Sequence, residues 1–299
     1  MDKIDIVERI MTNFWKITEK NDAKRIASQT PDTGLTLCLD IPYIDDGKKE
    51  HLLDVYYPEN AENLPVIIDI HGGGWMYGYK EINKYYCMHI AKKGFVVFNI
   101  NYSLVPDVTF AGQVRDCMAA FHWIGEHLGD YPCDKSSVFL TGDSAGGHLA
   151  SYLAVVNTSE KLREMYDTLS SSLEFNALCL TSPVAFPDDG GIFSFGLSPI
   201  FGKDRKYRPY GKLFNTDSVL KMGKTPPVLI ITSTGDFLAE KQSHKLRDVY
   251  ELENIPVILH DFPAFEGKKL EHVFAVINPF FEPGVQAINE MIEFFNSYR

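Results

Sequence analysis

The sequence has few cysteines and no paired cysteine motif. Its five cysteines are scattered along the chain, and none forms a C-x-x-C pair: Cys38, Cys87, Cys117, Cys133 and Cys179. A zinc site with the usual cysteine spacing and a dithiol redox motif are therefore excluded. We expect most of these thiols to be reduced side chains of the core.

Long apolar runs are also missing. No stretch reaches the length of a membrane-spanning helix, and the N-terminal segment MDKIDIVERIMTNFWK has charges in every turn, unlike the continuous apolar region of a secretory signal. We therefore expect a cytoplasmic protein without stable membrane insertion.

Positive charge is in short supply. The 29 Lys and Arg residues against 40 Asp and Glu residues give a formal net charge of −11. This balance works against nucleic acid or an anionic membrane surface as a partner. No Walker A motif, dinucleotide-binding glycine pattern or metal-ligand set appears, so we expect no cofactor and no bound metal.

From residue 65 onward, short apolar runs alternate with longer helical stretches. Strands buried on both faces that alternate with helices predict an α/β fold, with a mostly parallel sheet and helices on both faces. At 299 residues we expect a single domain over residues 1–299. The expected strands are 65–70, 95–100, 137–142, 177–181, 227–233 and 256–262, and the expected helices are 81–93, 113–128, 145–156, 240–252 and 285–295.

Three segments fall outside this alternation. Apolar residues at helical spacing predict an amphipathic helix over residues 4–17. Residues 35–43 and 52–57 predict two antiparallel strands joined by a turn. The long interval between Ser182 and Thr225 is rich in glycine, proline and aromatic residues, which favours a lid or binding segment.

Ser144 stands in the pattern G-x-S-x-G, between a predicted strand and a predicted helix. In that context the pattern predicts a serine on a sharp, strained turn with its hydroxyl at the end of the sheet. The helix that begins there offers free N–H groups to a neighbouring anion. The alternative is that Ser144 is an ordinary helix N-cap.

Three consecutive glycines follow His71 at the end of another predicted strand. Three glycines cost conformational entropy unless backbone N–H groups must approach a ligand closely, although a plain strand-to-helix turn could use one or two. Glycine N–H groups from this loop, together with that of Ala145, could hold an oxyanion.

A serine nucleophile needs a base and an orienting acid, and in this architecture both follow the serine along the chain. We expect His148, one turn into the next helix, and His244, within a helix, to be structural. His260 ends a buried strand, whereas His272 follows a loop that can reach the catalytic end of the sheet. We therefore favour His272 over His260.

Asp236 is the favoured acid because it follows a predicted strand, and catalytic groups gather at the carboxyl ends of strands. The alternative is an aspartate that caps the next helix. Asp261, beside His260, and Asp217, within the long irregular interval, are weaker candidates.

These motifs together resemble the α/β-hydrolase superfamily and, within it, the hormone-sensitive-lipase-like esterases. The shared motifs are HGGG at 71–74, NYSLVPD at 101–107, GDSAGG at 142–147 and DFL at 236–238, with His272 last. The similarity covers roughly residues 35–295.

The resemblance implies a role for each site residue. Ser144 would be the nucleophile, His272 the general base and acid, and Asp236 the acid that orients it. The backbone N–H groups of Gly73, Gly74 and Ala145 would form the oxyanion hole. Gly72 would shape the turn or add a further donor. The implied activity is that of a serine carboxylic ester hydrolase that forms an acyl-enzyme.

The resemblance also implies a cap, formed by residues 1–30 and 183–224. From the apolar insertion we expect a small-molecule ester with a small to medium hydrophobic group as substrate. An amidase, peptidase or arylformamidase with the same triad, and a non-catalytic small-molecule receptor with this fold, remain alternatives. The sequence does not define the natural substrate or the oligomeric state, and a homo-oligomer is one of the alternatives.

The chain departs from the family pattern at three points. Ser103 stands where the family usually has an arginine that braces the scaffold, and the loop before His272 is long and rich in lysine. His148 replaces a residue that is often asparagine in the family. These departures bear on subfamily and substrate more than on the chemistry.

Overall fold

The strands of this chain form one mixed sheet. The computed structural model describes residues 3–189 and 213–299, with side chains from residue 13 onward. The strands are β1 (Leu35–Pro42), β2 (Leu52–Pro58), β3 (Leu64–Ile70), β4 (Val96–Ile100), β5 (Cys133–Asp143), β6 (Ala177–Thr181), β7 (Val228–Ser233) and β8 (Val257–Phe262). Their order is β1-β2-β4-β3-β5-β6-β7-β8. Strand β2 is antiparallel to β1 and β4, and the other pairs are parallel, which confirms the predicted sheet.

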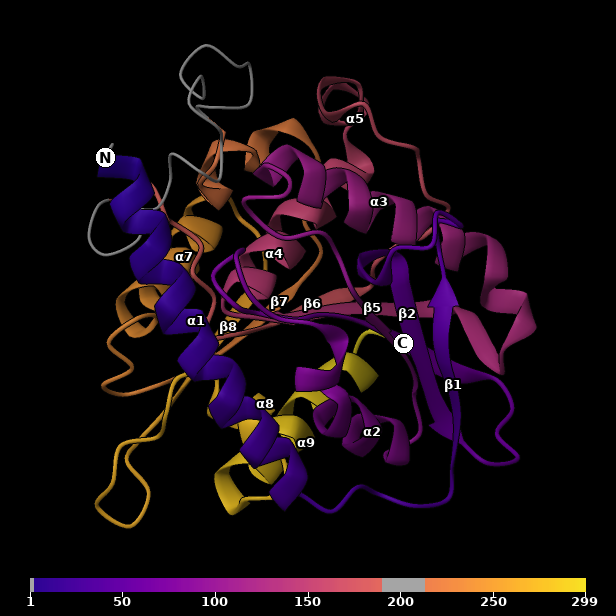
Figure 1. Cartoon of the computed structure of the whole chain (residues 1–299). Helices are drawn as coiled ribbons and strands as arrows, with labels where there is room; N and C mark the ends of the chain where they lie inside the picture. The colour runs from indigo at the N-terminus through magenta and orange to yellow at the C-terminus, as the bar shows by residue number, and fades with distance from the viewer. Residues whose placement is uncertain (1–2, 190–212) are drawn as a thin grey trace.

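Helices cover both faces of the sheet, as the sequence predicts. Helices α3, α4 and α5 lie above it in Figure 1, and α2, α8 and α9 lie below it. The helix bounds are α1 (Lys3–Ser28), α2 (Lys84–Lys92), α3 (Phe110–His127), α4 (Ala145–Thr158), α5 (Glu160–Tyr166), α7 (Glu240–Leu252), α8 (Phe274–Ile277) and α9 (Glu282–Asn296). The fold is that of the α/β-hydrolases.

Two hydrophobic clusters separate the sheet from these helices. Successive side chains of a strand point to opposite faces, so Val66 and Ile68 of β3 pack with Leu149 of α4. Ile67 packs in the other cluster with Met291 of α9. This double burial explains why the parallel strands read as continuous apolar runs.

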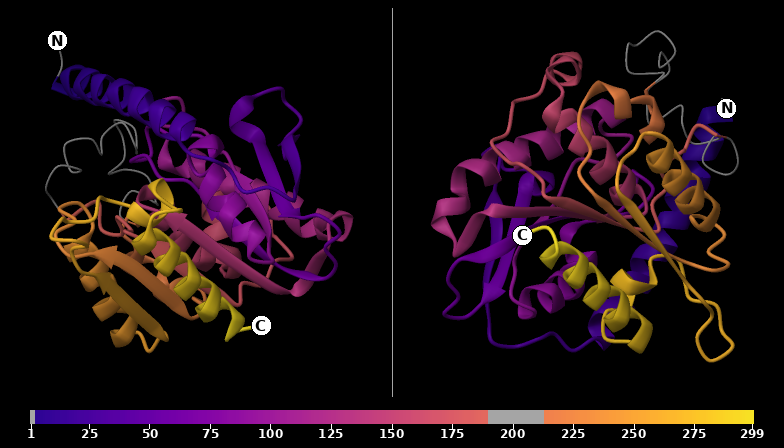
Figure 2. Two further views of the ribbon diagram at one scale, coloured as in Figure 1. Left: turned by 90° about the horizontal axis from the view of Figure 1, so that it is seen from below. Right: turned by 180° about the vertical axis from the view of Figure 1, so that it is seen from behind.

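Helix α1 is longer than the predicted helix over residues 4–17. Its second half lacks an apolar period but is held by polar contacts with distant segments. Arg25 donates to the carbonyl oxygens of Ile82 at 3.0 Å and Ile277 at 3.4 Å, and Gln29, just after α1, donates to Ile277 at 2.7 Å. Figure 2 shows α1 on the outside of the sheet and helix layers. Tertiary contacts therefore extend the helix beyond its amphipathic part.

The segment expected to form the second cap piece is described only at its two ends. Residues 190–212, within the expected 183–224, lie outside the described residues. At the two flanks, Phe186 and Phe214 are buried in the cluster that contains α4. A cap over this segment, and the expected single domain, therefore stay predictions.

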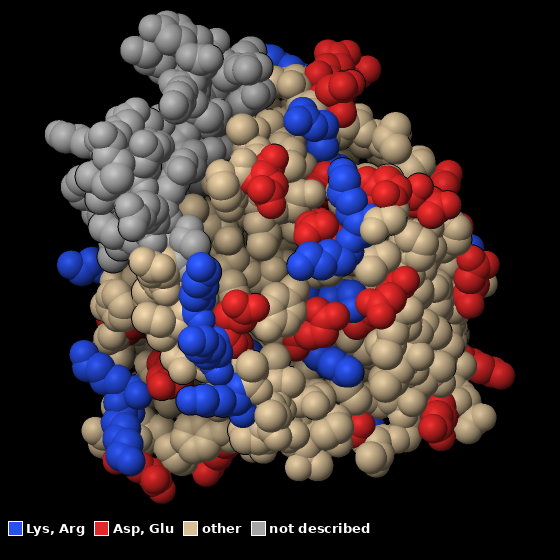
Figure 3. Space-filling model, viewed as in Figure 1, with Lys and Arg blue, Asp and Glu red and all other residues tan. Residues whose placement is uncertain are grey.

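The surface mixes charges of both signs. On the face seen in Figure 3, Lys and Arg side chains are interspersed with Asp and Glu side chains. In the described part of the chain, no helix combines the length and apolar character that crossing a membrane requires.

Candidate active site

Ser144 lies on a sharp turn between β5 and α4. Its backbone has φ 52° and ψ −116°, and its N–H donates to the carbonyl oxygen of Thr181, at the end of β6, at 2.9 Å. A Cβ atom on Gly146 would lie 2.0 Å from the carbonyl oxygen of Ile70, so only glycine allows α4 to start this close to β3. The expected strained turn is present at this position.

The structure brings the hydroxyl of Ser144, the ring of His272 and the carboxyl group of Asp236 into one hydrogen-bonded chain. Ser144 Oγ lies 2.9 Å from His272 Nε2, and His272 Nδ1 lies 2.8 Å from Asp236 Oδ2. Because an ionised carboxylate only accepts, Nδ1 carries the proton, and Nε2 is free to accept from the serine hydroxyl. This tautomer suits a histidine that removes the proton of Ser144.

Asp236 also caps the segment that leads into α7. Its Oδ1 accepts from the N–H groups of Leu238 at 3.0 Å and Ala239 at 3.1 Å, while Oδ2 faces His272. Burial raises the pKa of Asp236, but the hydrogen bond and charge of His272 and the N–H of Leu238 outweigh burial and hold the pKa below its ordinary value. The capping arrangement and the pairing with histidine therefore occur in the same residue.

His272 reaches the site from the loop between β8 and α8. This loop folds over the loop that follows β7: the side chain of Lys269 lies against Gly235, and Ser233 donates to the carbonyl oxygen of Leu270 at 3.4 Å. The His272 side chain is 20% exposed, so it opens to the surface on one side.

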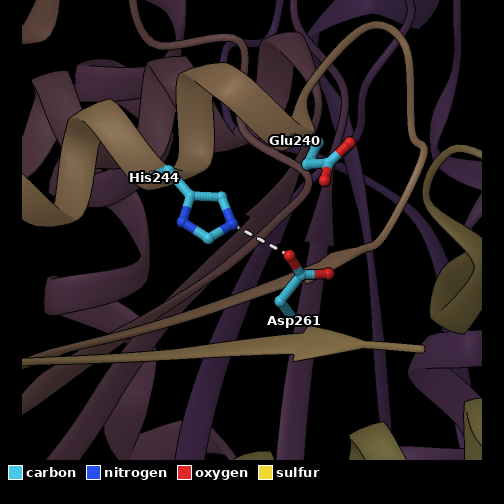
Figure 4. Close-up of side chains that lie close together, drawn as sticks. All are labelled: Glu240, His244 and Asp261. Atoms are coloured by element: carbon cyan, nitrogen blue, oxygen red, sulfur yellow. Dashed lines mark hydrogen bonds and ion pairs between the residues drawn. The ribbon is translucent and has the colours of Figure 1, made fainter.

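The other candidate residues have partners elsewhere. His260 pairs with Glu290 of α9. Asp261 accepts from Thr234 at 3.0 Å. It also lies 2.8 Å from His244 Nε2, and Figure 4 shows these two side chains pointing toward one another. None of these contacts reaches Ser144. Asp217 is an exposed residue of a short 3₁₀ helix, Thr216–Ser218.

Glu240, His244 and Asp261 place their ligand atoms within 4.8 Å of one another, a donor set that could hold a metal ion (Figure 4). All three side chains already have protein partners, since Glu240 accepts from the N–H of Gly235 at 2.8 Å. Together with the Asp261 contact to Thr234, this bond braces the loop that carries Asp236.

The loop after β3 presents two free backbone donors. Gly73 has φ 119°, and a Cβ atom there would lie 2.0 Å from the carbonyl oxygen of Tyr77, so glycine is required. The N–H groups of Gly73 and Gly74 donate to no acceptor among the described residues. The N–H of Ala145, the first residue of α4, lies at the positive end of that helix.

Gly72 is not a third donor in this loop. Its N–H already donates to Asp143 Oδ1 at 3.0 Å, and a Cβ atom on Gly72 would lie 2.4 Å from Asp143 Oδ2. Of the two roles expected for Gly72, this contact supports the shaping of the turn and corrects the suggestion of an added oxyanion donor.

A buried amide holds this arrangement and has no signal in the local sequence. Asn83, just before α2, donates from Nδ2 to Asp143 at 2.8 Å and to Asp69 at 2.9 Å. Burial and the charge of Asp143 raise the pKa of Asp69 to about 7. The glycine loop is therefore tied through Asp143 and Asn83 to the end of β3.

His148 joins two segments on either side of the site. Its ring is fully buried; Nδ1 accepts from Trp75 Nε1 at 3.2 Å, and Nε2 donates to the carbonyl oxygen of Phe214 at 2.7 Å. Since acceptance at Nδ1 needs the neutral ring, and burial lowers the pKa of His148 to about 4, the ring stays uncharged at neutral pH. The structural role expected for His148 is a link between the glycine loop and the segment after residue 212.

Replacing His148 with asparagine is expected to reduce the loss of stability in acid. The pKa of His148 is about 4 in the folded protein and near 6.5 in the unfolded chain. The contribution of the neutral ring to the free energy of unfolding is therefore complete above pH 6.5 and is lost as the pH falls toward 4. The free-energy difference between wild type and His148→Asn should shift by about 2 kcal/mol between pH 7 and 4.5. Urea unfolding followed by circular dichroism measures this shift.

The comparison with wild type matters because other buried groups titrate in the same range. His71, also with a pKa of about 4, acts in the same direction as His148, whereas the raised pKa of Asp69 acts in the opposite direction. His122→Asn, on an exposed part of α3, is the control and should leave the pH profile unchanged. Parallel profiles for His148→Asn and wild type would contradict the prediction.

Comparisons with known proteins agree with this fold. The BD-FAE family model matches residues 53–184. Esterase LipQ of Mycobacterium tuberculosis is 31% identical over 155 residues, and carboxylesterase NlhH of the same organism is 32% identical over 111 residues. These matches cover 50% and 36% of this chain, but only 35% of each relative's length.

A solved structure matches nearly the whole chain. Esterase B from Lactobacillus rhamnosis has a TM-score of 0.94 and 29% identity, and the match covers 100% of this chain and 96% of esterase B. The same enzyme inhibited by a C4-C4 SN3 tributyrin phosphonate has a TM-score of 0.93. By its fold and these similarities, the chain has the α/β-hydrolase fold and resembles the hormone-sensitive-lipase-like esterases.

Proposed function

We propose that this protein is a serine carboxylic ester hydrolase that acts through an acyl-enzyme on small to medium hydrophobic esters. The observation that carries the proposal is the hydrogen-bonded chain from Ser144 through His272 to Asp236, with contacts of 2.9 Å and 2.8 Å. A helix cap would need neither the histidine nor the glycine loop beside it.

In the proposed reaction, His272 Nε2 removes the hydroxyl proton as Ser144 Oγ attacks the ester carbonyl carbon. The carbonyl oxygen becomes an oxyanion and accepts from the N–H groups of Gly73, Gly74 and Ala145. The tetrahedral intermediate then collapses, and the alcohol leaves with the proton held by His272.

Water completes the cycle by the same route. His272 removes a proton from the water molecule, whose oxygen attacks the acyl carbon. Collapse of the second intermediate releases the carboxylic acid and returns the proton to Ser144. Asp236 holds the ring in place and stabilises its positive charge at each transfer, a role supported by its lowered pKa.

The preference for a small acyl group has support outside the site. Esterase B, which matches this chain over its length, is inhibited by a C4-C4 SN3 tributyrin phosphonate. LipQ and NlhH, named as an esterase and a carboxylesterase, support the same reaction class.

A panel of 4-nitrophenyl esters from acetate to laurate is expected to show the highest kcat/KM at short to medium acyl chains. Matched 4-nitroanilides, peptides and an aryl formamide extend the panel to the amidase, peptidase and arylformamidase alternatives. We expect the esters to exceed the amide substrates by more than about tenfold, because an amine is the poorer leaving group. A fluorophosphonate probe should label the protein at Ser144.

Each contrary result identifies a different error. A clear preference for long chains would contradict the substrate size, and faster turnover of amides or formamides would contradict the ester assignment. A folded protein that neither reacts with the probe nor hydrolyses any substrate would favour the non-catalytic receptor.

A further inference from the structure

The indole of Trp15 lies directly against the glycine loop. A Cβ atom on Gly74 would come within 2.8 Å of Trp15 Cζ2, 3.3 Å of Cη2 and 3.9 Å of Cε2. The same ring stacks on Tyr77, with centroids 5.1 Å apart and planes 7° from parallel. A residue of α1 therefore borders the position where the oxyanion is proposed to form.

The indole faces Gly74 with its six-membered ring, with Cζ2 nearest and Cη2 next. Nε1 is bonded to Cε2, and Cε2 is bonded to Cζ2, so these three atoms share one edge of the ring. Cε2 is the third nearest atom after Cζ2 and Cη2, so the N–H, one bond beyond Cε2, lies next to the part of the ring that contacts the glycine loop.

This N–H is buried and has no acceptor. Trp15 Nε1 is inaccessible to solvent and forms no hydrogen bond within the part of the chain that the structure describes. A buried donor without an acceptor is unfavourable and rare in folded proteins. Beside a candidate active site, a bound ligand with an oxygen acceptor would satisfy it.

Polar contacts fix Tyr77, on which the indole of Trp15 stacks, relative to the loop and to α1. The hydroxyl of Tyr77 donates to Asp22 of α1 at 2.8 Å, and the N–H of Tyr77 donates to the carbonyl oxygen of Gly73 at 3.0 Å. Asp22 is itself paired with Arg25, which anchors α1 to the main fold. The indole is therefore held in place before any ligand arrives.

We propose that Trp15 Nε1 donates a hydrogen bond to an oxygen atom in the acyl or alcohol chain of the bound ester, distinct from the reacting carbonyl oxygen. Trp15 is then a specificity-determining residue that favours esters with an ether or hydroxyl oxygen near the reacting bond. This inference rests on the proposed ester hydrolysis at Ser144.

Pairs of esters that differ only by an oxygen in place of a methylene group test the inference. The acyl pair is 4-nitrophenyl methoxyacetate and 4-nitrophenyl butyrate; the alcohol pair is 2-methoxyethyl butyrate and butyl butyrate. Taking the ratio of kcat/KM within each pair, and comparing it between variants, removes the intrinsic reactivity of the esters.

Trp15→Phe removes the donor and keeps an aromatic ring against Tyr77. In at least one pair, the kcat/KM of the oxygen-bearing ester divided by that of its carbon partner should fall about fivefold, mainly through a higher KM for the oxygen-bearing ester. If Trp15 had only a structural role, the substitution would lower kcat/KM for both esters of a pair by the same factor. Ile17→Ala, an exposed position on the same helix, is the matched control and should leave both ratios unchanged.

The outcomes separate this inference from the proposed function. Unchanged ratios in an active Trp15→Phe protein would overturn the role of Trp15 alone. A wild-type protein without Ser144-dependent hydrolysis would overturn the proposed function and this inference with it. If circular dichroism shows that Trp15→Phe is unfolded, Trp15→Leu, which also lacks the donor, takes its place.

Discussion

Replacing Ser144 with alanine is expected to lower kcat for 4-nitrophenyl butyrate by about five orders of magnitude. The variant lacks the oxygen that forms the acyl-enzyme, so only binding and the oxyanion donors remain to assist attack by water. The fold should persist, because the hydrogen bond from the Ser144 N–H to Thr181 is kept and, among the described residues, the hydroxyl forms a hydrogen bond with His272 alone. Initial rates and thermal unfolding measure the two effects.

Ser151→Ala is the matched control for this substitution. Ser151 is a buried serine on α4, and its hydroxyl contacts Thr216 at 2.9 Å and the carbonyl oxygen of His148 at 2.8 Å. Its loss should cost about 1 kcal/mol of stability and leave kcat within about threefold of wild type. If Ser144→Ala kept more than about a hundredth of wild-type activity, the nucleophile would have to be another group.

Replacing Asp236 with asparagine is expected to lower kcat by about 10³- to 10⁴-fold while changing the free energy of unfolding by only about 1 kcal/mol. The amide oxygen can still accept from Leu238 and Ala239, so the cap survives. The amide nitrogen then faces His272 Nδ1, which favours the tautomer whose Nε2 carries the proton. That tautomer cannot accept from Ser144.

Two further variants separate the cap from the chemistry. Asp236→Ala removes both functions and should lose about 1 kcal/mol more stability than Asp236→Asn. Asp261→Asn changes the neighbouring acid that faces His244 and should leave kcat within about threefold of wild type. Equal losses of activity at Asp236 and Asp261 would mean that the acid is wrongly assigned.

The strand-and-helix pattern and the region around Ser144 could be predicted because their causes are local. Continuous apolar runs follow from strands buried on both faces, and the turn at Ser144 needs glycine at Gly146 because the backbone of β3 lies so close. Asp236 and His272 could be placed by chain order and by their positions after strands. Their roles stay predictions until the variants are measured.

The second half of α1 and the partners of the glycine loop could not be predicted in this way. Residues 18–28 are helical because Arg25 reaches carbonyl groups far along the chain, not because of their own pattern. Asn83 and Trp15 stand in no motif, and their importance depends on Asp143 and Gly74 lying beside them.

The amino-acid pattern alone predicts the order of strands and helices along the chain, the sharp turn at Ser144 and the short list of acids and histidines that could serve it. Steric limits on the backbone and the burial of apolar runs act over a few residues, so they leave a local pattern. The packed structure was needed to show that Gly72 donates to Asp143, that His148 links two segments and that the Trp15 N–H has no acceptor among the described residues. Hydrogen bonds depend on distance and direction between residues far apart in the chain, and those are set only when the sheet and its helices are packed.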